Sequence, residues 1–214
     1  MSLKIKVCGM RNYDQVRALS ELGIDFAGFI FYDKSPRYVL NAFSDNEIQQ
    51  ISNMNISRVG VFVNEPLENL KMKVSEWKLD YVQLHGNESP AYCKEVSMYS
   101  NVIKAFRVGP DDDPLQLSHP FEGITYCLFD TKGDQLGGTG KKFNWNQLLL
   151  PLQHSFFLSG GIDENDAAEI IALKKKSTQL FAIDINSKFE LSPGNKNINK
   201  ISSFVDDIKK LEHE

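Results

Sequence analysis

The sequence predicts an α/β protein that folds as one domain, a (β/α)8 barrel, over residues 1–214. Short β-rich runs alternate with amphipathic stretches along the whole chain, which implies parallel strands joined by right-handed crossovers. Eight such runs give units of about 27 residues, near the ~30 that a strand–helix–strand unit needs. A doubly wound open sheet is the competing fold, and it is disfavoured because no GxGxxG motif follows the first strand.

The predicted strands are short apolar runs bounded by turn residues. Alternation of side chains assigns their faces: Lys6 shares a face with Cys8, and Leu180 and Ala182 share one with Asp184. The eight runs are Leu3–Cys8, Phe26–Phe31, Ser57–Val63, Tyr81–His85, Val102–Val108, Thr125–Asp130, Ser155–Ser159 and Gln179–Asp184.

The helices between these strands are predicted from apolar spacing and capping residues. Tyr13–Leu22 is the clearest, because Val16 and Leu19 share a face, Asn12 can cap its start and Gly23 can end it. Weak or irregular helices are expected after the fifth and sixth strands, where prolines interrupt 111–122 and the segment 144–149 is short. The remaining predicted helices are Asp45–Asn53, Leu67–Trp77, Pro90–Val96, Asp163–Leu173 and Ile198–Leu211.

Composition excludes several classes of protein. The chain has 24 Lys and Arg against 28 Asp and Glu, which argues against nucleic acid as the main partner. Its longest stretch without these residues, Asn144–Ile162, is broken by Pro151 and a glycine pair, so no membrane span is expected. An odd number of widely spaced cysteines suits neither a disulfide framework nor a zinc site, and a cytoplasmic protein is expected.

The ends of the predicted strands are unusually polar. In a parallel barrel the carboxyl ends of the strands and the loops beyond them carry the active site. Cys8 ends the first strand, His85 the fourth, Asp130 the sixth and Asp184 the eighth, while Arg37 lies in the loop after the second. A metal is not expected, because the sequence has no HExxH motif and no cluster of Cys and His.

Glycines after the seventh strand predict a phosphate site. Gly160 and Gly161 precede a helix start and can offer backbone N–H groups to an anion. Asn186 and Ser187 follow the eighth strand, and barrel enzymes commonly bind phosphate with the loops after strands seven and eight. A phosphorylated small molecule is therefore the expected ligand. The glycine-rich loop Thr131–Lys142 is either a lid over the substrate or a solvated surface loop.

Seven segments, taken together and in order, resemble the phosphoribosylanthranilate isomerase family of tryptophan biosynthesis. The resemblance spans nearly the whole chain. The segments are KVCGM at 6–10, GFIFYDKSPRYV at 28–39, VGVFVNE at 59–65, VQLHGNE at 82–88, LFDTKGDQLGGTG at 128–140, FLSGGI at 157–162 and AIDINSKFELSPGNKN at 182–197.

The resemblance implies an Amadori rearrangement of N-(5-phosphoribosyl)anthranilate to 1-(o-carboxyphenylamino)-1-deoxyribulose 5-phosphate, without a cofactor. It implies that Asp130 is the general acid, Cys8 the general base, and Arg37 the group that holds the anthranilate carboxylate. The other residues that we expect to bind the substrate are His85, Asp184, Gly160, Gly161, Asn186 and Ser187.

Two residues near these positions raise further expectations. A free thiol has a pKa near ~8.5, so Cys8 needs a nearby cation to act as a base, and Lys6 on the same face can supply it. The family commonly has a Ser-Gly pair where this chain has Ser187 and Lys188, so Lys188 either brings an ammonium group to the phosphate or points to solvent.

Two other functions remain open from the residues alone. One is another sugar-phosphate isomerase, epimerase or lyase on a similar barrel, which would explain the glycines but not Arg37 together with a cysteine base. The other is a binding protein for phosphorylated metabolites that has no activity, which would not need both Cys8 and Asp130. A monomer or a homodimer is expected.

Overall fold

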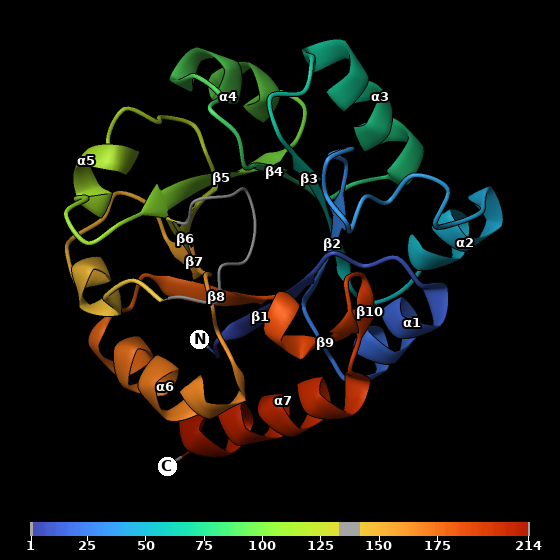
Figure 1. The fold of residues 1–214 in the computed structure, drawn as a ribbon. Helices are drawn as coiled ribbons and strands as arrows, with labels where there is room; N and C mark the ends of the chain where they lie inside the picture. The colour runs from blue at the N-terminus through green and yellow to red at the C-terminus, as the bar shows by residue number, and fades with distance from the viewer. Residues whose placement is uncertain (1, 133–141, 214) are drawn as a thin grey trace.

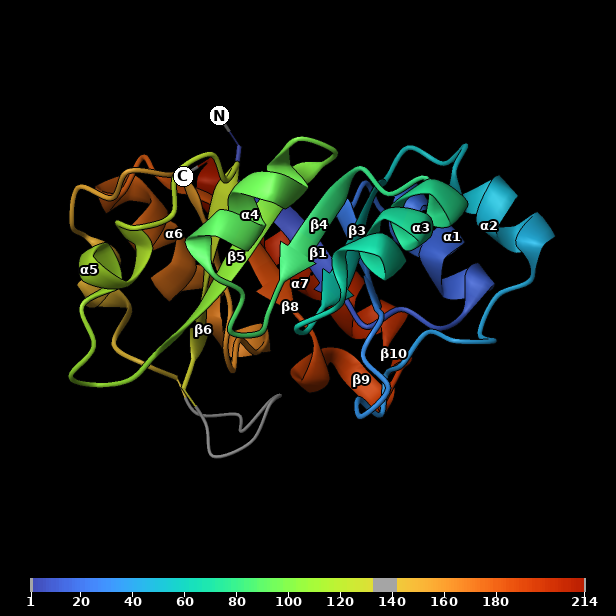
Figure 2. The same cartoon turned by 90° about the horizontal axis from the view of Figure 1, so that it is seen from above.

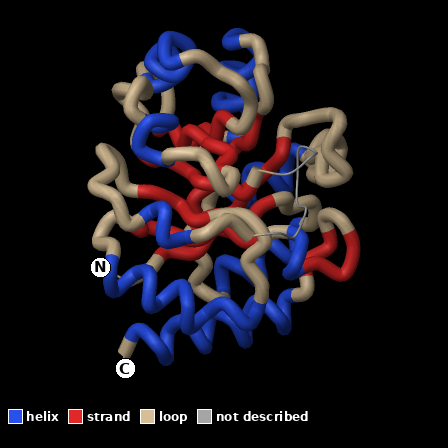
Figure 3. Tube along the Cα trace, turned by 60° about the vertical axis from the view of Figure 1, so that its left-hand side comes forward, coloured by secondary structure: helices blue, strands red, loops and turns tan. Residues whose placement is uncertain are grey.

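The computed structural model describes residues 2–132 and 142–213. Over these residues, eight parallel strands follow one another around a closed barrel, and the last strand pairs with the first. Helices surround the strands (Figures 1 and 3). The predicted (β/α)8 barrel is thus confirmed. Its strands are β1 (Lys4–Cys8), β2 (Phe26–Ile30), β3 (Ser57–Phe62), β4 (Tyr81–Leu84), β5 (Asn101–Val108), β6 (Tyr126–Thr131), β7 (Phe156–Leu158) and β8 (Leu180–Ile185).

The outer helices begin at the capping residues that the sequence offers. Asn12 accepts a hydrogen bond from the Gln15 amide at the start of the first helix, and Ser44 forms a capping box with Glu47 at the second. None of the described helices is both long enough and apolar enough to cross a membrane. The longer helices are α1 (Tyr13–Glu21), α2 (Asp45–Ile51), α3 (Leu67–Trp77), α4 (Pro90–Ser97), α6 (Ala167–Lys176) and α7 (Ile198–Glu212).

The helices after β5 and β6 are short, as expected. The first is the five-residue α5 (Pro114–Ser118), and the second is a single 3₁₀ turn, Trp145–Leu148. The helix predicted from Asp163 needs a correction, because a 3₁₀ turn at Glu164–Asp166 comes first and α6 starts only at Ala167. Asp163 and Asp166 each accept a backbone amide of this turn, which holds it in the tighter conformation.

Two apolar layers pack against the barrel wall. One lies between the strands and the helices, and it contains Cys93 and Cys127. The other fills the barrel interior with aromatic rings, among which Tyr126 and Phe181 stack with their centroids 4.4 Å apart. The face predicted for Leu180 is wrong: Leu180 packs in the outer layer, because the register shifts where β7 meets β8 and Phe181 turns inward.

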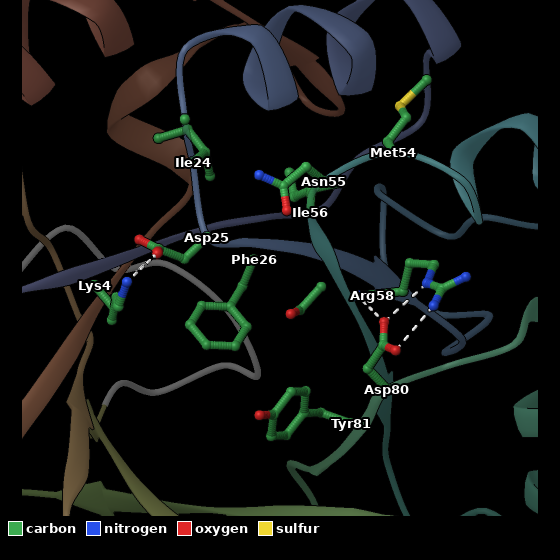
Figure 4. A pocket seen from close by; sticks show the side chains of 12 residues that line it. Lys4, Ile24, Asp25, Phe26, Met54, Asn55, Ile56, Arg58, Asp80 and Tyr81 are labelled. Carbon is green, nitrogen blue, oxygen red and sulfur yellow. Dashed lines mark hydrogen bonds and ion pairs between the residues drawn. The ribbon is translucent and has the colours of Figure 1, made fainter.

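Ion pairs join neighbouring strands at the amino-terminal end of the barrel (Figure 4). Lys4 at the start of β1 bonds the carboxylate of Asp25, just before β2, at 2.8 Å. Arg58 of β3 donates two side-chain hydrogen bonds to Asp80, just before β4, each at 2.8 Å. These groups line a polar hollow of about 520 Å³ around Phe26 and Tyr81. Because the acidic and basic groups pair with one another, they join β1 to β2 and β3 to β4 at this end of the barrel.

A small hairpin follows β8 at the opposite end of the barrel. It consists of β9 (Glu190–Ser192) and β10 (Asn195–Lys196), which pair antiparallel. Figure 2 shows this hairpin beside the loop that follows β2 and away from the N-terminus. Gln15 of α1 fixes the hairpin, because its amide group donates to the carbonyl of Lys196 and accepts from the amide of the same residue.

Candidate active site

A cavity of about 320 Å³ opens at the carboxyl ends of the strands. Its lining comes from the segments after β2, β3, β4, β7 and β8, as well as from the strands themselves. All nine residues that the sequence predicts for the site line this one cavity: Cys8, Arg37, His85, Asp130, Gly160, Gly161, Asp184, Asn186 and Ser187. The structure therefore brings together residues that lie up to 179 positions apart in the chain.

Cys8 is buried at the end of β1, with only 4% of its surface exposed. Its neighbour across the strand pair is Gly28, where a Cβ atom would lie 2.8 Å from the Cys8 sulfur. A side chain at position 28 would therefore displace the thiol. Burial raises the pKa of Cys8 above its ordinary value, and the positive charge of Lys6 opposes this rise only in part.

Lys6 forms a buried ion pair with Asp184 beneath Cys8. Its ammonium nitrogen lies 2.9 Å from Oδ1 of Asp184, and both side chains are almost fully enclosed. Burial acts to lower the pKa of Lys6, but Asp184 and Cys8 together outweigh it and the pKa is raised. Lys6 thus has the effect on Cys8 that the sequence suggests, but Asp184 neutralises much of its charge.

Asp130 lies across the cavity and contacts His85. The Asp130 carboxylate accepts the amide of Thr131 at 2.9 Å and lies 3.4 Å from Nε2 of His85. The other ring nitrogen, Nδ1 of His85, is 2.8 Å from the side-chain nitrogen of Gln83. Gly160, with φ of +92°, packs so tightly on this carboxylate that a Cβ there would lie 2.9 Å from Oδ1.

The loop that carries His85 is fixed by a second buried ion pair. Glu88 accepts the amides of Asn64 at 2.8 Å and Gly86 at 3.0 Å, and it also pairs with the Lys104 ammonium at 2.8 Å. Lys104 in turn donates to the carbonyls of Leu84 and Gly86. One carboxylate and one ammonium thereby join the chain after β3 and the end of β4 to the middle of β5.

Arg37 is held by a residue of the hairpin rather than left free. Its Nε and Nη2 atoms donate to the carboxylate of Glu190 at 3.0 and 2.7 Å. Among the described residues, Nη1 of Arg37 has no hydrogen-bond partner. The guanidinium therefore presents its outer edge to the cavity, where it can meet an anion.

The glycine pair after β7 and the segment after β8 form a further part of the cavity wall. Gly160 and Gly161 both have positive φ and turn the chain into the 3₁₀ turn that precedes α6. Asn186 accepts a hydrogen bond from the Lys196 ammonium at 2.8 Å. Lys188 is exposed, beyond the segment that lines the cavity. The predicted lid falls mainly on residues 133–141, which lie outside the described residues.

Three residues of this region were not predicted as site residues. Gln83 shares a strand face with His85, and that two-residue spacing could have revealed it. Glu190 had no local signal, because its partner Arg37 lies more than 150 positions earlier in the chain. Lys196 reaches the site only through its contacts with Glu190 and Asn186.

Comparisons with known proteins agree with this arrangement. A family model described as N-(5'phosphoribosyl)anthranilate (PRA) isomerase matches residues 5–207. The chain belongs to this isomerase family. A member from Parabacteroides distasonis is 39% identical over 207 residues, covering 95% of this chain and 92% of its own length. A member from Thermotoga neapolitana is 36% identical, covering 98% of this chain and all of its own.

Solved isomerase structures have the same fold. The phosphoribosyl anthranilate isomerase of Thermotoga maritima superimposes with a TM-score of 0.83 at 32% identity, covering 97% of this chain and 99% of that one. Another isomerase structure holds reduced 1-(o-carboxyphenylamino)-1-deoxyribulose 5-phosphate, with a TM-score of 0.79 at 31% identity and the same coverage of both chains.

Proposed function

We propose that this chain isomerises N-(5'-phosphoribosyl)anthranilate to 1-(o-carboxyphenylamino)-1-deoxyribulose 5-phosphate in tryptophan biosynthesis. The observation that supports it best is the placement of Cys8 and Asp130 in the lining of one cavity, with Arg37 and the glycine pair. Such a site has an acid, a base and anchors for both anionic ends of the substrate. The product differs from the substrate only in the positions of protons and bonds, so the reaction needs no external oxidant or reductant.

Asp130 is the proposed general acid of the first step. Its protonated carboxyl gives a proton to the ring oxygen of the ribose as the bond between C1' and that oxygen breaks. The lone pair of the anthranilate nitrogen forms the C=N bond of an open-chain iminium. Asp184 is a second carboxyl group in the lining of the same cavity, and burial raises its pKa.

Cys8 is the proposed general base of the second step. Its thiolate removes the proton from C2', and the electrons of that C–H bond form a C1'=C2' double bond while the iminium electrons return to nitrogen. The resulting enol-amine loses its hydroxyl proton and gains one at C1', which yields the ketone. The iminium makes the C2' proton acidic, so a thiolate is a sufficient base.

The two anionic ends of the substrate set its orientation. We assign the anthranilate carboxylate to the outer edge of Arg37, and the phosphate to Gly160, Gly161 and Ser187. The sugar then spans the cavity between Cys8 and Asp130. We also propose that its ligands are small phosphorylated metabolites, that it has no nucleic-acid or membrane partner, and that it acts in the cytoplasm.

The test is turnover of freshly made phosphoribosylanthranilate, followed by the loss of its fluorescence. We expect activity in the wild type and a fall in kcat of about 10²–10⁴-fold in Cys8→Ala and in Asp130→Asn. Cys127→Ala is the matched control, because it removes a buried thiol that packs between strands and helices. An inactive wild type, or full activity in a Cys8→Ala, Asp130→Ala double variant, would contradict the proposal.

Substrate selectivity separates this function from another sugar-phosphate isomerase or a binding protein. A sugar phosphate without the anthranilate group should not be isomerised, because Arg37 then has no carboxylate to hold. Tight binding of both compounds without turnover would favour a binding protein. Sedimentation would decide between the monomer and the homodimer that we expect; the Thermotoga maritima enzyme is described as dimeric.

A further inference from the structure

Glu190, Arg37 and Lys196 form a contiguous cluster of charges beside the cavity, which we call the hairpin triad. Glu190 accepts three hydrogen bonds from Arg37, of which Nε donates two and Nη2 donates one, and it also accepts one from the Lys196 ammonium at 2.6 Å. The amide of Gly194 adds a further hydrogen bond at 3.0 Å. Glu190 and Lys196 belong to the hairpin after β8, while Arg37 comes from the loop after β2.

Solvent does little to screen these charges. The exposed fractions of the side chains are 3% for Glu190, 0% for Lys196 and 15% for Arg37. Burial alone would raise the pKa of Glu190, but the hydrogen bonds from Arg37 and the charge of Lys196 hold it below its ordinary value. The carboxylate is therefore ionised at neutral pH.

The net charge of the hairpin triad indicates an electrostatic role for Lys196 in addition to packing. With Glu190 alone, Arg37 would belong to a neutral pair and would attract an anion weakly. Burial lowers the pKa of Lys196, and the Glu190 carboxylate at 2.6 Å opposes this by favouring the ammonium form. As an ammonium, Lys196 adds a second positive charge, so the hairpin triad keeps one net positive charge beside the cavity. Gln15 already holds the backbone of Lys196 on α1 with two hydrogen bonds, so the ammonium is not needed to dock the hairpin.

The geometry of Glu190 decides which edge of Arg37 faces the ligand. Its carboxylate occupies Nε and one proton of Nη2, which leaves the outer edge formed by Nη1 and Nη2. That edge offers two parallel N–H groups, the arrangement that a planar carboxylate accepts.

We propose that Lys196 determines the affinity of the site for the substrate carboxylate by offsetting the charge of Glu190, which in turn fixes the orientation of Arg37. The inference rests on the proposed function. Lys196 is thus a positioning residue that does not touch the substrate. Its effect should appear only with ligands that carry the carboxylate.

The experiment measures binding of two ligands by calorimetry: reduced 1-(o-carboxyphenylamino)-1-deoxyribulose 5-phosphate and the same compound without the o-carboxyl group. We expect Lys196→Met to weaken binding of the first on the order of tenfold or more, and of the second by less than about twofold. In turnover, KM should rise by a larger factor than kcat falls, because Lys196 touches no reacting atom and its charge opposes the rise in the pKa of Cys8 less than that of Lys6 does. Lys209→Met, which removes an exposed lysine of α7, is the control for net charge.

A double variant tests the charge count directly. Lys196→Met leaves a neutral pair, whereas Glu190→Gln with Lys196→Met leaves the charge of Arg37 unopposed. The double variant should therefore bind the carboxylate ligand more tightly than Lys196→Met alone. This recovery is not expected if Lys196 only supports the fold. Lys196→Gln, which keeps a hydrogen-bonding group, provides the same comparison if the methionine variant does not fold.

Other outcomes would overturn the inference. Equal losses for the two ligands would mean that Lys196 acts on the phosphate or on the fold. A wild type that binds both ligands equally would remove the carboxylate role of Arg37 and with it this inference, while leaving the reaction intact. A wild type that binds neither ligand and has no turnover would instead contradict the proposed function.

Discussion

At the scale of single residues, the role of base that we propose for Cys8 requires a thiolate, whereas burial of Cys8 disfavours the thiolate. Burial raises the pKa of its thiol above the ordinary value, so the free protein holds Cys8 protonated at neutral pH. A base must lose its proton, so the step in which Cys8 removes the C2' proton should become faster as pH rises through the alkaline range.

Titration of the Cys8 thiol tests the role of Lys6. In a Cys93→Ala, Cys127→Ala background, the midpoint should lie above 9.0, and Lys6→Met should move it higher, because a cation that favours the thiolate is lost. The background is required because burial also raises the pKa of those two thiols, to about 11 and about 12. An unchanged midpoint in Lys6→Met would show that Lys6 does not tune the thiol.

Individual site residues could be predicted to different extents. Cys8, Asp130 and Asp184 follow from one rule, since polar residues at the carboxyl ends of parallel strands meet at one end of the barrel. The partners of Arg37 could not be predicted, because Glu190 is recognised only once the loop after β2 and the hairpin after β8 are placed side by side.

At the scale of secondary-structure elements, the pair of Glu88 and Lys104 joins the ends of β3 and β4 to the middle of β5. Glu88→Gln should lower the free energy of unfolding by about 3 kcal/mol, near the lower limit for breaking a buried pair, because two carbonyls still accept hydrogen bonds from Lys104. The loop with His85 should also loosen, which hydrogen exchange would detect as lower protection after β4.

The free energy of unfolding that Glu88→Gln loses should depend on pH in one direction. Burial alone would raise the pKa of Glu88, but Lys104 and the backbone amides hold it below 4.5, its ordinary value. The stabilisation is therefore present above that pH and disappears as pH falls through the lower pKa of the folded state. Chemical denaturation of both proteins should show the difference shrinking below pH 4.5. A constant difference from pH 7 to pH 3 would contradict this assignment.

The order of the elements was predictable, but two local details were not. Alternation of strand and helix patterns indicated every barrel strand, and Asn12 indicated the start of α1. The inward turn of Phe181 depends on a register shift between β7 and β8. The sequence of either strand taken alone does not reveal this shift. The 3₁₀ turn before α6 depends on which amides Asp163 and Asp166 accept, and the same residues suit a regular helix start equally well.

At the scale of the whole molecule, the two ends of the barrel have separate tasks. The ion pairs at the amino-terminal end hold strands together, and the cavity lies at the other end. Asp80→Asn should lower the free energy of unfolding by about 1 kcal/mol, a small value because 37% of the Asp80 side chain is exposed. The melting temperature should fall by roughly 2–4 °C.

Turnover of Asp80→Asn should stay at the wild-type level, since the strand ends that carry the cavity are not changed. Steady-state kinetics well below the melting temperature would check this. A matching loss of kcat would mean that the two ends are coupled through the barrel.

The ion pair of Lys6 and Asp184 also has a consequence for the making of the protein. Asp184 is added to the growing chain 178 residues after Lys6. At usual rates of synthesis, that interval is roughly 10–35 s. During this interval Lys6 has no carboxylate to pair with. We therefore expect β1 of the nascent chain to stay unpacked until Asp184 has been added. Cys8 thus acquires its surroundings only after β8, the last strand of the barrel, has left the ribosome.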